Sequence, residues 1–413
     1  MSKPGSAAFL AYGRQLIEDD DVAAVAAVLR GDWLTTGPAV EAFERAFAAK
    51  VGAPFAIACS SGTAALHLPM LALGLGPGDV AIVPALTFVA TANAVRYVGA
   101  EVVFADVAPE TGLMESAHFG DAIARARATY PSHRIRAALP VHLNGQACDL
   151  AGLARLAAAE DMALVEDACH ALGGDTGPAV ADRIGACRYG VMAAFSGHPV
   201  KAIAMGEGGV ITTRDEASAD RLARLRAHGI TRDPSRFTER AQAFDDEGQL
   251  NVWYHELIEL GFNYRASDLH CALGLSQLKK LDRFVDVRRR LVERYRARLA
   301  PLAPLVRPLG LAGRGTPAWH LFVARIDFAA AGISRNTVMA RLKAKGIGTQ
   351  VHYLPVNRQP YYRARYGATT LPGADAYYAQ ALSLPLHAAM SDADVDRVVD
   401  GLRDVLHLQG RST

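Results

Sequence analysis

The sequence predicts an α/β protein with a large domain on a mostly parallel central sheet and a smaller C-terminal α/β domain. From about residue 54, short apolar runs alternate with amphipathic segments, which is the pattern of βαβ units. After a strongly charged helical stretch near residue 300, the spacing of these runs changes. A chain of 413 residues also has room for two or three domains of ordinary size.

Seven short runs in the first part of the chain are the predicted strands of the central sheet. They are apolar in character, as expected for strands buried on both faces. Helical patterns lie between them or follow the last one, at residues 64–73, 150–159 and 216–227. The predicted strands are residues 55–58, 81–84, 102–105, 137–141, 164–166, 191–195 and 210–212.

The second half of the chain has a different order of elements. Residues 268–302 are predicted to be one long charged helix, followed by a strand at 319–326 and helices at 338–345 and 395–406. We therefore predict a large domain over residues 12–275 and a small domain over 276–413. The basic run RRRLVERYRAR lies inside the long helix and is interrupted by Glu293, Leu291, Val292 and Tyr295. Its pattern indicates a solvated helix face with an apolar stripe rather than a nucleic-acid site.

Composition excludes several classes of protein. Lys and Arg total 44 against 42 Asp and Glu, so the charge of +2 gives no reason to expect binding to nucleic acid or to an anionic membrane. Five widely spaced cysteines without a CxxC pair predict neither a metal site nor a disulfide framework, and they fit the reducing cytoplasm. Residues 51–78 carry no Lys, Arg, Asp or Glu, but Pro, Ser and Gly interrupt them. They are predicted to form a buried strand, turn and helix rather than a membrane span.

A turn of small residues lies between the first predicted strand and the first predicted helix, in the segment CSSGTAALHL. Ser60, Ser61, Gly62 and Thr63 are small enough to let backbone N–H groups approach an anion, and the helix N-terminus adds a favourable dipole. The same pattern is equally typical of a hydroxyl side chain that caps a helix. The turn alone does not distinguish an anion site from a helix cap.

Two charged residues follow later strands of the predicted sheet. Asp167, in VEDACHALGG, lies at the carboxyl edge where α/β folds bind ligands, and it either pairs with a buried cation or caps a helix. Lys201, in AAFSGHPVKAIAMGEGG, follows Ser196 and lies in an apolar, Gly-rich stretch whose other charge is Glu207. A lysine in a loop is usually solvated, but desolvation in such a stretch lowers its pKa and makes its amine a nucleophile.

An anion cradle, a carboxylate and a desolvated lysine at the ends of three strands are together what pyridoxal phosphate requires. The phosphate needs N–H and hydroxyl donors, the pyridine nitrogen needs an acid to stay protonated, and the aldehyde needs an amine. No dinucleotide fingerprint or Walker loop competes, because GEGG has the spacing of neither motif. The three segments therefore predict a pyridoxal phosphate enzyme.

The order of five motifs resembles the DegT/StrS-type nucleotide-sugar aminotransferases, which are fold type I pyridoxal phosphate enzymes. The motifs are SGTAALHL, PALTFVATANA, EDACHALGG, FSGHPVKAIAMGEGG and LGFNYRASDLHCALGLSQLKKLDRF, and the match runs from about residue 12 to residue 406. Five further segments resemble the members that act in pseudaminic acid biosynthesis. Those enzymes aminate C4 of a UDP-linked 4-keto-6-deoxy-N-acetyl-hexosamine. The segments are DWLTTGPAVEAFE, PVHLNGQACD, HGITRDP, GIGTQVHYLPVNRQPYY and ALSLPLH.

The resemblance implies roles for residues around the cofactor. Lys201 would form the Schiff base and move the proton between the amino-donor carbon and C4′ of the cofactor, and Asp167 would keep the pyridine nitrogen protonated. His170 would lie near the phenolic oxygen. Phe88 would stack on the ring, although core packing is the simpler explanation for Phe88 alone. The phosphate would be bound by Gly62, Thr63 and Ser196.

The resemblance also implies a homodimer with shared active sites, because Asn263 of the GFNYR motif reaches the phosphate of the neighbouring subunit's cofactor in this family. Arg265 would hold the phosphates of the sugar nucleotide or, with equal weight, form an intramolecular ion pair. His320 in AWHLF is a further candidate for the pocket, with a core histidine as the simpler alternative. The other residues expected to line the substrate pocket are Thr35, Thr36, His352 and Tyr353.

Two positions depart from the pattern of the family. Gly197 stands where related enzymes often have an aromatic or bulkier residue, so a looser wall is expected beside the cofactor. Cys169 replaces the Ala or Ser that is more usual between Asp167 and His170, and a buried thiol is the simplest interpretation.

The resulting prediction is a cytoplasmic aminotransferase with a ping-pong cycle. L-glutamate would convert the cofactor to pyridoxamine phosphate, and the amine would then pass to the UDP-linked keto-sugar. Other keto-sugar nucleotides, such as GDP-4-keto-6-deoxymannose or a 3-keto-6-deoxy-sugar, are alternative acceptors. Lys201 argues against the related sugar dehydratases, which carry His at that position, and the intact set of Lys201, Asp167 and Ser196 argues against a non-catalytic cofactor-binding protein.

Overall fold

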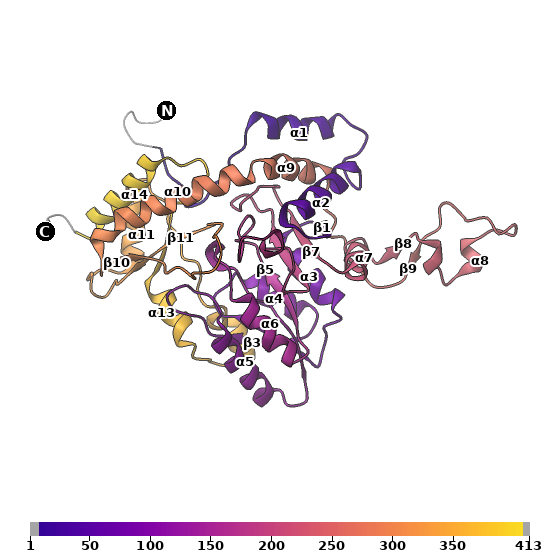
Figure 1. Cartoon of the computed structure of the whole chain (residues 1–413), viewed down its shortest axis with the longest axis horizontal. Coiled ribbons are helices and arrows are strands. Elements are labelled where there is room, and N and C mark those ends of the chain that lie inside the picture. The colour runs from indigo at the N-terminus through magenta and orange to yellow at the C-terminus, as the bar shows by residue number, and fades with distance from the viewer. Residues whose placement is uncertain (1–7, 408–413) are drawn as a thin grey trace.

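The computed structural model describes residues 8–407, which form two α/β parts joined along the long helix α10 (Leu281–Leu299) (Figure 1). The larger part contains a seven-stranded sheet with the order β1-β7-β6-β5-β4-β2-β3. Strand β7 is antiparallel to both of its neighbours, and the other neighbouring pairs are parallel. The strands are β1 (Phe55–Cys59), β2 (Asp79–Pro84), β3 (Glu101–Ala105), β4 (Arg134–Ala138), β5 (Ala163–Asp167), β6 (Met192–Ser196) and β7 (Gly209–Thr213).

The predicted fold class is confirmed, with one strand shifted along the chain. Every residue of β2 is buried, as expected for a strand that is covered on both faces. The strand predicted at residues 137–141 lies earlier, at β4, so this prediction was wrong in its position. Pro140 has no N–H for the ladder, and the chain beyond it makes an isolated parallel bridge between Val141 and Asp167.

Helices connect the strands of the large part. The uncharged segment 51–78 contains β1 and the helix α3, so the predicted buried strand, turn and helix are confirmed. Within residues 8–407, no helix combines the length and apolar character that a membrane crossing requires. The helices of this part are α1 (Asp19–Leu29), α2 (Pro38–Val51), α3 (Gly62–Ala72), α4 (Val89–Tyr97), α5 (Ser116–Thr129), α6 (Leu150–Ala159), α7 (Glu216–Leu225) and α9 (Asp268–Lys279).

The smaller part is a three-stranded antiparallel sheet with helices around it. Its strands are in the order β10-β11-β12, and α14 packs against both α10 and α11. Its elements are β10 (Val306–Pro308), β11 (Phe322–Ile326), α11 (Arg335–Ala344), α12 (Pro360–Tyr366), α13 (Pro372–Gln380), β12 (Ala381–Leu384) and α14 (Asp392–Val405). Short 3₁₀ turns occupy Leu143–Gly145, Val180–Asp182, Pro234–Arg236, Ala300–Leu302 and Val356–Arg358.

The long charged helix predicted at residues 268–302 is two helices, so this prediction needs correction. Helix α9 ends at Lys279 and α10 begins at Leu281, with Lys280 between them. The Lys280 ammonium lies 2.6 Å from the Asp20 carboxylate and 2.8 Å from that of Asp21, both at the start of α1. Neither Gly nor Pro marks this break in the sequence, and the acidic partners come from a segment that is distant along the chain.

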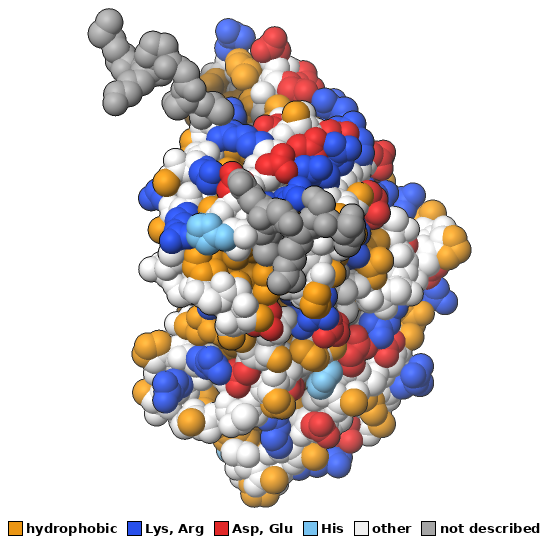
Figure 2. All heavy atoms as spheres, turned by 90° about the vertical axis from the view of Figure 1, so that its left-hand side faces the viewer, with side chains coloured by type: hydrophobic (Ala, Val, Ile, Leu, Met, Phe, Trp, Pro, Cys, Tyr) orange, Lys and Arg blue, Asp and Glu red, His pale blue; other side chains and the backbone are white. Residues whose placement is uncertain are grey.

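The basic run in α10 has the predicted apolar stripe, but its first residue, Arg288, is buried and does not belong to a solvated face. Leu291, Val292 and Tyr295 are buried in the core of the small part. The basic residues on the opposite face form ion pairs with α14, and Figure 2 shows acidic and basic side chains intermixed on this side of the molecule. The pairs are Arg290–Asp392, Arg294–Asp396, Arg298–Asp396 and Arg298–Asp400.

Helix α10 contributes to the cores of both parts. Leu281 and Val285 pack into the core of the large part, whereas Leu291 and Val292 pack into that of the small part. The predicted boundary between residues 275 and 276 falls within α9. We propose instead that the chain passes from one domain to the other within α10, between Val285 and Leu291.

An arm formed by residues 228–261 extends away from the large part (Figure 1). Strands β8 (Ile230–Thr231) and β9 (Glu256–Leu257) pair at its base, and helix α8 (Arg240–Ala243) lies further out. Several large apolar side chains of the arm are exposed, including Val252 at 93%, Trp253 at 69% and Leu260 at 82%.

Candidate active site

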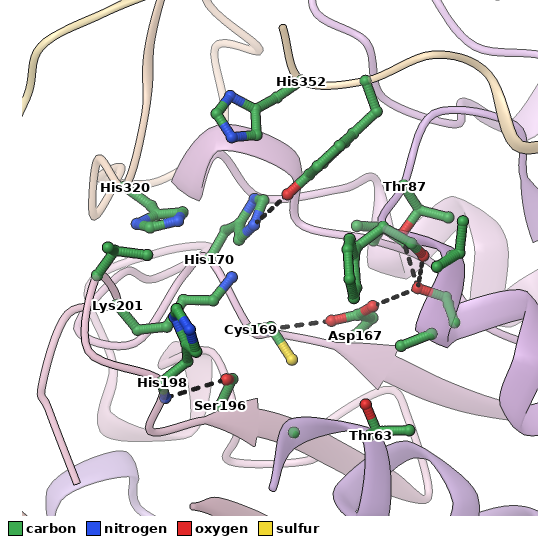
Figure 3. A pocket seen from close by; sticks show the side chains of 18 of the residues that line it. Thr63, Thr87, Asp167, Cys169, His170, Ser196, His198, Lys201, His320 and His352 are labelled. Atoms are coloured by element: carbon green, nitrogen blue, oxygen red, sulfur yellow. Dashed lines mark hydrogen bonds between the residues drawn. The ribbon is translucent and has the colours of Figure 1, made fainter. Parts of the chain in front are cut away.

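A cavity of about 700 Å³ lies at the carboxyl ends of β5 and β6, where the predicted cofactor residues meet (Figure 3). Its floor includes the first turn of α3, and its opposite wall comes from residues 350–354 of the small part. Parallel sheets bind ligands at this edge because the loops that leave the strands converge there. The sequence-predicted residues that line it are Gly62, Thr63, Phe88, Asp167, His170, Ser196, Lys201, His352 and Tyr353.

Lys201 extends from the loop after β6 into this cavity (Figure 3). Its backbone N–H donates to the His198 carbonyl oxygen at 2.9 Å. Burial lowers the pKa of its amine below the ordinary value, while Cys169 and the Asp167 carboxylate act in the opposite direction. The partly buried Lys201 side chain thus has the lowered pKa that the sequence predicts, and its catalytic role stays a prediction.

Asp167, the last residue of β5, is held by two hydrogen bonds and is 4% exposed. Its Oδ2 accepts from the Thr91 hydroxyl at 2.7 Å, and its Oδ1 accepts from the Cys169 N–H at 3.2 Å. Thr91 is in turn 2.6 Å from the Thr87 hydroxyl. The helix-cap alternative is wrong for Asp167, because residues 168–179 form turns and bends rather than a helix.

The turn at the start of α3 caps the helix, and its other predicted property, an anion site, stays a prediction. Ser61 caps the helix, since its Oγ accepts from the Ala64 N–H at 3.1 Å. Gly62 and Thr63 follow it in the first helical turn and line the cavity beside Ser196. A Cβ atom at Gly62 would lie 2.7 Å from the Ser196 Cβ and 2.9 Å from its Oγ, so the close approach of α3 and β6 requires glycine.

Gly62→Ala is therefore expected to lower the stability of the protein by about 1–3 kcal/mol, because the added methyl group forces α3 and Ser196 apart. We expect cofactor affinity to fall about tenfold or more, since 1.4 kcal/mol corresponds to a factor of ten. Thermal unfolding and a pyridoxal phosphate titration measure the two effects. Gly120→Ala is the matched control, because nothing lies within 4 Å of the added Cβ on α5. Equal cofactor affinities for the two variants would contradict this account.

His170 has its ring fixed by hydrogen bonds at both nitrogens. The Asn144 N–H donates to Nδ1 at 3.3 Å, and the Tyr353 hydroxyl lies 3.3 Å from Nε2. Burial lowers the pKa of His170 well below its ordinary value, and the positive charge of the nearby Lys201 lowers it further. The ring is thus neutral, and we assign its proton to Nε2 because Nδ1 accepts a backbone N–H.

The upper wall of the cavity contains aromatic and histidine rings. His320 packs against His170 with ring centroids 4.4 Å apart, and it is both buried and in contact with the cavity. Phe88 lies 6.1 Å from the Tyr353 ring and is 56% exposed, so core packing does not explain it. His352 lies 5.4 Å from the ring of Tyr12.

Four predicted site residues lie outside this cavity. Thr35 and Thr36 are exposed, and Thr35 bridges to Ser267. Asn263 is exposed at the base of the arm, and Arg265 bridges to the strand residue Cys59. Among residues 8–407, no carboxylate lies within 4.0 Å of the Arg265 guanidinium, so the ion-pair alternative is wrong. Their roles in binding stay predictions.

The two departures from the family pattern have different outcomes. A Cβ atom at Gly197 would lie 2.5 Å from the Met205 sulfur, so Met205 fills the space and the expected looser wall is wrong. Cys169 is a free thiol that touches the cavity, and burial raises its pKa well above the ordinary value. Cys169 is only partly buried, so the interpretation as a buried thiol is wrong in its exposure.

Several cavity residues were not predicted from the sequence. Thr91 lies in the first turn of α4 and Thr87 lies just before that helix, and their signal was the position of α4 directly after a central strand. Tyr12 comes from the segment before α1, where nothing in the local pattern points to a site. Gln350 and Gln359 flank the predicted His352 and Tyr353. The part of the chain that the structure describes contains no group of three His, Cys, Asp or Glu side chains suited to a metal ion.

Comparison with known proteins identifies the family. The DegT/DnrJ/EryC1/StrS aminotransferase family matches residues 15–403. The chain belongs to this family. It is 36% identical to the spore coat polysaccharide biosynthesis protein SpsC of Bacillus subtilis, over 96% of this chain and 97% of that protein. The protein is therefore a sugar aminotransferase that uses pyridoxal phosphate.

Solved structures of other proteins share the fold of this sugar aminotransferase. The aminotransferase PseC of Helicobacter pylori, involved in the biosynthesis of pseudoaminic acid, superposes with a TM-score of 0.85 over 97% of this chain and 100% of that one, at 24% identity. The putative sugar aminotransferase Spr1654 of Streptococcus pneumoniae, in its PMP form, gives a TM-score of 0.83 over 96% and 99%, at 26% identity. The fold type I architecture is thus confirmed.

Proposed function

We propose that this sugar aminotransferase transfers an amino group from L-glutamate to C4 of a UDP-linked 4-keto-6-deoxy-N-acetyl-hexosamine. The observation that carries the proposal is the convergence of Lys201, Asp167 and the first turn of α3 in one cavity, closed by the segment GIGTQVHYLPVNRQPYY. That segment resembles the enzymes of pseudaminic acid biosynthesis and supplies His352 and Tyr353 to the wall. The relation to SpsC, a polysaccharide biosynthesis protein, supports a sugar acceptor.

The cavity fits pyridoxal phosphate. In our proposal Gly62, Thr63 and Ser196 hold the phosphate, because the missing Cβ of Gly62 keeps room between α3 and Ser196 and the helix N-terminus favours an anion. Asp167 pairs with the ring nitrogen, and Phe88 and His170 flank the ring. When bound, the cofactor supplies a conjugated ring that withdraws electrons from the carbon bonded to the transferred amine.

Lys201 is the proposed base for both half-reactions. Its Nζ removes the proton from the amino-donor carbon, and in the second half-reaction it delivers a proton to the sugar carbon that receives the amine. Burial lowers the pKa of this amine, which raises the fraction that is neutral and able to accept a proton. Neutral His170 and His320 nearby add no positive charge to the site.

The substrate is tested by giving the purified protein L-glutamate and then a panel of keto-sugar nucleotides. The panel contains the UDP-linked 4-keto-6-deoxy-N-acetyl-hexosamine, GDP-4-keto-6-deoxymannose and a 3-keto-6-deoxy-sugar nucleotide. We expect glutamate to remove the visible absorbance that depends on Lys201, and only the UDP-linked sugar to restore it. Proton NMR of the product identifies the aminated carbon. Restoration by another sugar alone would overturn the proposed acceptor while leaving the aminotransferase reaction intact.

We further propose a cytoplasmic homodimer with shared active sites. The arm exposes Val252, Trp253 and Leu260, and exposed large apolar side chains are common in protein interfaces. Asn263 and Arg265 lie next to the base of this arm in sequence and do not line the cavity of their own chain, which is compatible with a role in the neighbouring site. All five cysteines are free thiols, in keeping with a reducing compartment.

Trp253→Ser combined with Leu260→Glu is expected to shift the protein from dimer to monomer, because burying a charge at an apolar interface is unfavourable. Sedimentation velocity over a range of protein concentrations measures the change. Leu311→Ser is the control, since Leu311 is an exposed apolar residue of the small part, at 57%. A double variant that sediments like the parent protein would rule out the arm as the interface.

A further inference from the structure

Arg288 is a buried cation that contacts the backbone of Lys201. It lies in α10 and is 3% exposed. One guanidinium nitrogen, NH2, donates to the carbonyl oxygen of Lys201 at 3.2 Å. The Nε and NH1 atoms are buried and have no hydrogen-bond partner within residues 8–407, and no carboxylate in that range lies within 4.0 Å of the guanidinium.

The side chains around Arg288 do not neutralise it. His320 and His387 are buried at the end of the small sheet that faces the large part. Burial lowers the pKa of His387 to about 4 and that of His320 well below its ordinary value, and Arg288 adds to both effects. Burial also lowers the pKa of Arg288 to about 10, which leaves the guanidinium charged near neutral pH.

A buried charge with one carbonyl partner is a poor way to stabilise a fold. Transfer of an unpaired charge into a protein interior costs several kcal/mol, and apolar residues of similar volume often replace buried charges without loss of stability. The hydrogen-bond partner of Arg288 offers another explanation for the buried charge. The carbonyl group that it contacts belongs to Lys201, which also carries the reactive amine. Lys201 itself lies outside any strand or helix.

The ends of the loop around Lys201 are held by backbone hydrogen bonds, from the Gly197 N–H to the Gly208 carbonyl oxygen at 2.7 Å and from the Met205 N–H to the Gly197 carbonyl oxygen at 2.8 Å. The Lys201 N–H donates to the His198 carbonyl within the loop, and Gln277 Oε1 accepts from the Ala204 N–H at 3.3 Å. Arg288 is the contact that reaches Lys201 itself from α10, and α10 packs into the cores of both parts. The guanidinium therefore links the Lys201 backbone to the element that joins the two parts of the molecule.

We propose that Arg288 is a positioning residue for Lys201: it fixes the Lys201 backbone from α10 and thereby keeps the Lys201 amine in the poorly solvated cavity. This inference rests on the proposed role of Lys201 as the base. Without the bond from Arg288, the loop is expected to relax and the amine to gain solvation, which favours the ammonium form.

The other groups that face Lys201 also influence the pKa of its amine. Asp167 and Cys169 favour the charged amine. His198, Glu207 and Tyr353 also line the cavity. Burial keeps the pKa values of His170, His320 and His352 low, with that of His352 at about 4. These rings stay neutral over the pH range in which the amine titrates, so a change in the Lys201 pKa on mutation of Arg288 is not caused by their titration.

The test measures the pKa of the Lys201 amine in the full-length chain before cofactor is added. Trace acetylation with acetic anhydride across a pH series, read by mass spectrometry of the Lys201 peptide, reports the neutral fraction. We expect Arg288→Met to raise the pKa by about one unit, which is a tenfold smaller neutral fraction at a pH below both values. We expect Arg288→Lys, which keeps the charge but has a shorter and single donor group, to give a smaller rise.

Arg289→Met is the matched control on the same helix, because Arg289 bonds to the Pro317 carbonyl and to Asp286 instead of the Lys201 loop. It is expected to leave the Lys201 pKa unchanged. In the cofactor-loaded protein, single-turnover reaction with glutamate should slow about tenfold in Arg288→Met with little change in the glutamate concentration that gives half the maximal rate.

Thermal unfolding separates positioning from a purely structural role. We expect the melting temperature of Arg288→Met to equal or exceed that of the parent protein, since a buried unpaired charge is removed. An unchanged Lys201 pKa in Arg288→Met would overturn the proposal. If that variant does not fold, an unchanged pKa in Arg288→Lys overturns it instead. The labelling readout needs no substrate, so failure of the proposed acceptor sugar would leave this test intact.

Discussion

Lys201→Ala is expected to abolish amino transfer, with a loss of more than about 10⁴-fold in kcat, because in our proposal one residue performs both the covalent attachment and the proton transfer. Lys201 has no substitute in the cavity. Among the described residues that line it, Lys201 is the only lysine or arginine. The rate is measured as formation of 2-oxoglutarate from glutamate and, separately, as amination of the keto-sugar.

The matched control for this variant is Lys343→Ala, on the exposed face of α11. It removes an equal side chain far from the cavity and should retain the parent rate. A small external amine, such as methylamine, is expected to restore part of the activity of Lys201→Ala, since it can accept and return the proton. Activity of Lys201→Ala within about tenfold of the parent would contradict the assigned role, because general-base residues contribute about 10²–10⁴-fold.

Asp167→Asn is expected to lower kcat by about 10³-fold while the fold is retained, because the change removes a charge but little volume. The carboxylate is held by the Thr91 hydroxyl and the Cys169 N–H, so its orientation does not depend on the ligand. Without the negative charge, the proposed ring nitrogen loses its proton and the ring withdraws electrons less strongly. Both half-reactions should slow, which is measured by single-turnover kinetics with glutamate and with the keto-sugar.

Two further variants define the specificity of this effect. Asp121→Asn, on the exposed face of α5, is the matched control and should have the parent rate. Thr91→Val removes the hydrogen bond at 2.7 Å but leaves the charge, and is expected to cost about 1 kcal/mol, or about fivefold in rate. If Asp167→Asn slowed only one half-reaction, the carboxylate would be contacting a substrate rather than the cofactor.

Most of the central sheet and the main reactive groups were predictable from the sequence because their signals are local. Short apolar runs marked the strands, and Asp167, Ser196 and Lys201 each follow one of them. Strand ends at one edge of a parallel sheet are brought together by the topology, so the motifs could be combined without knowing any contact. The break at Lys280 had no such signal, since acidic residues of α1 hold it.

Contacts between distant segments explain what the sequence did not predict. Thr91 bonds to Asp167 from 76 positions away, and Arg288 bonds to the Lys201 carbonyl from 87 positions away. Met205 fills the space beside Gly197, which a comparison of residue types alone suggested was empty. Such pairs depend on how helices pack against strands, and the residue types involved have many other partners in folded proteins.

The sequence by itself determined the class of chemistry, because the amine, the carboxylate and the helix-turn residues are specified by type and by their place after a strand. Only the tertiary structure decided which of these groups share one cavity and whether they are charged or neutral in it. Lys201, His170 and His352 owe their lowered pKa values to burial by segments from both parts of the chain. Thr35, Thr36, Asn263 and Arg265 lie outside the cavity of their own chain. Burial and distance arise from the packing of the whole chain, so no local pattern could have specified them.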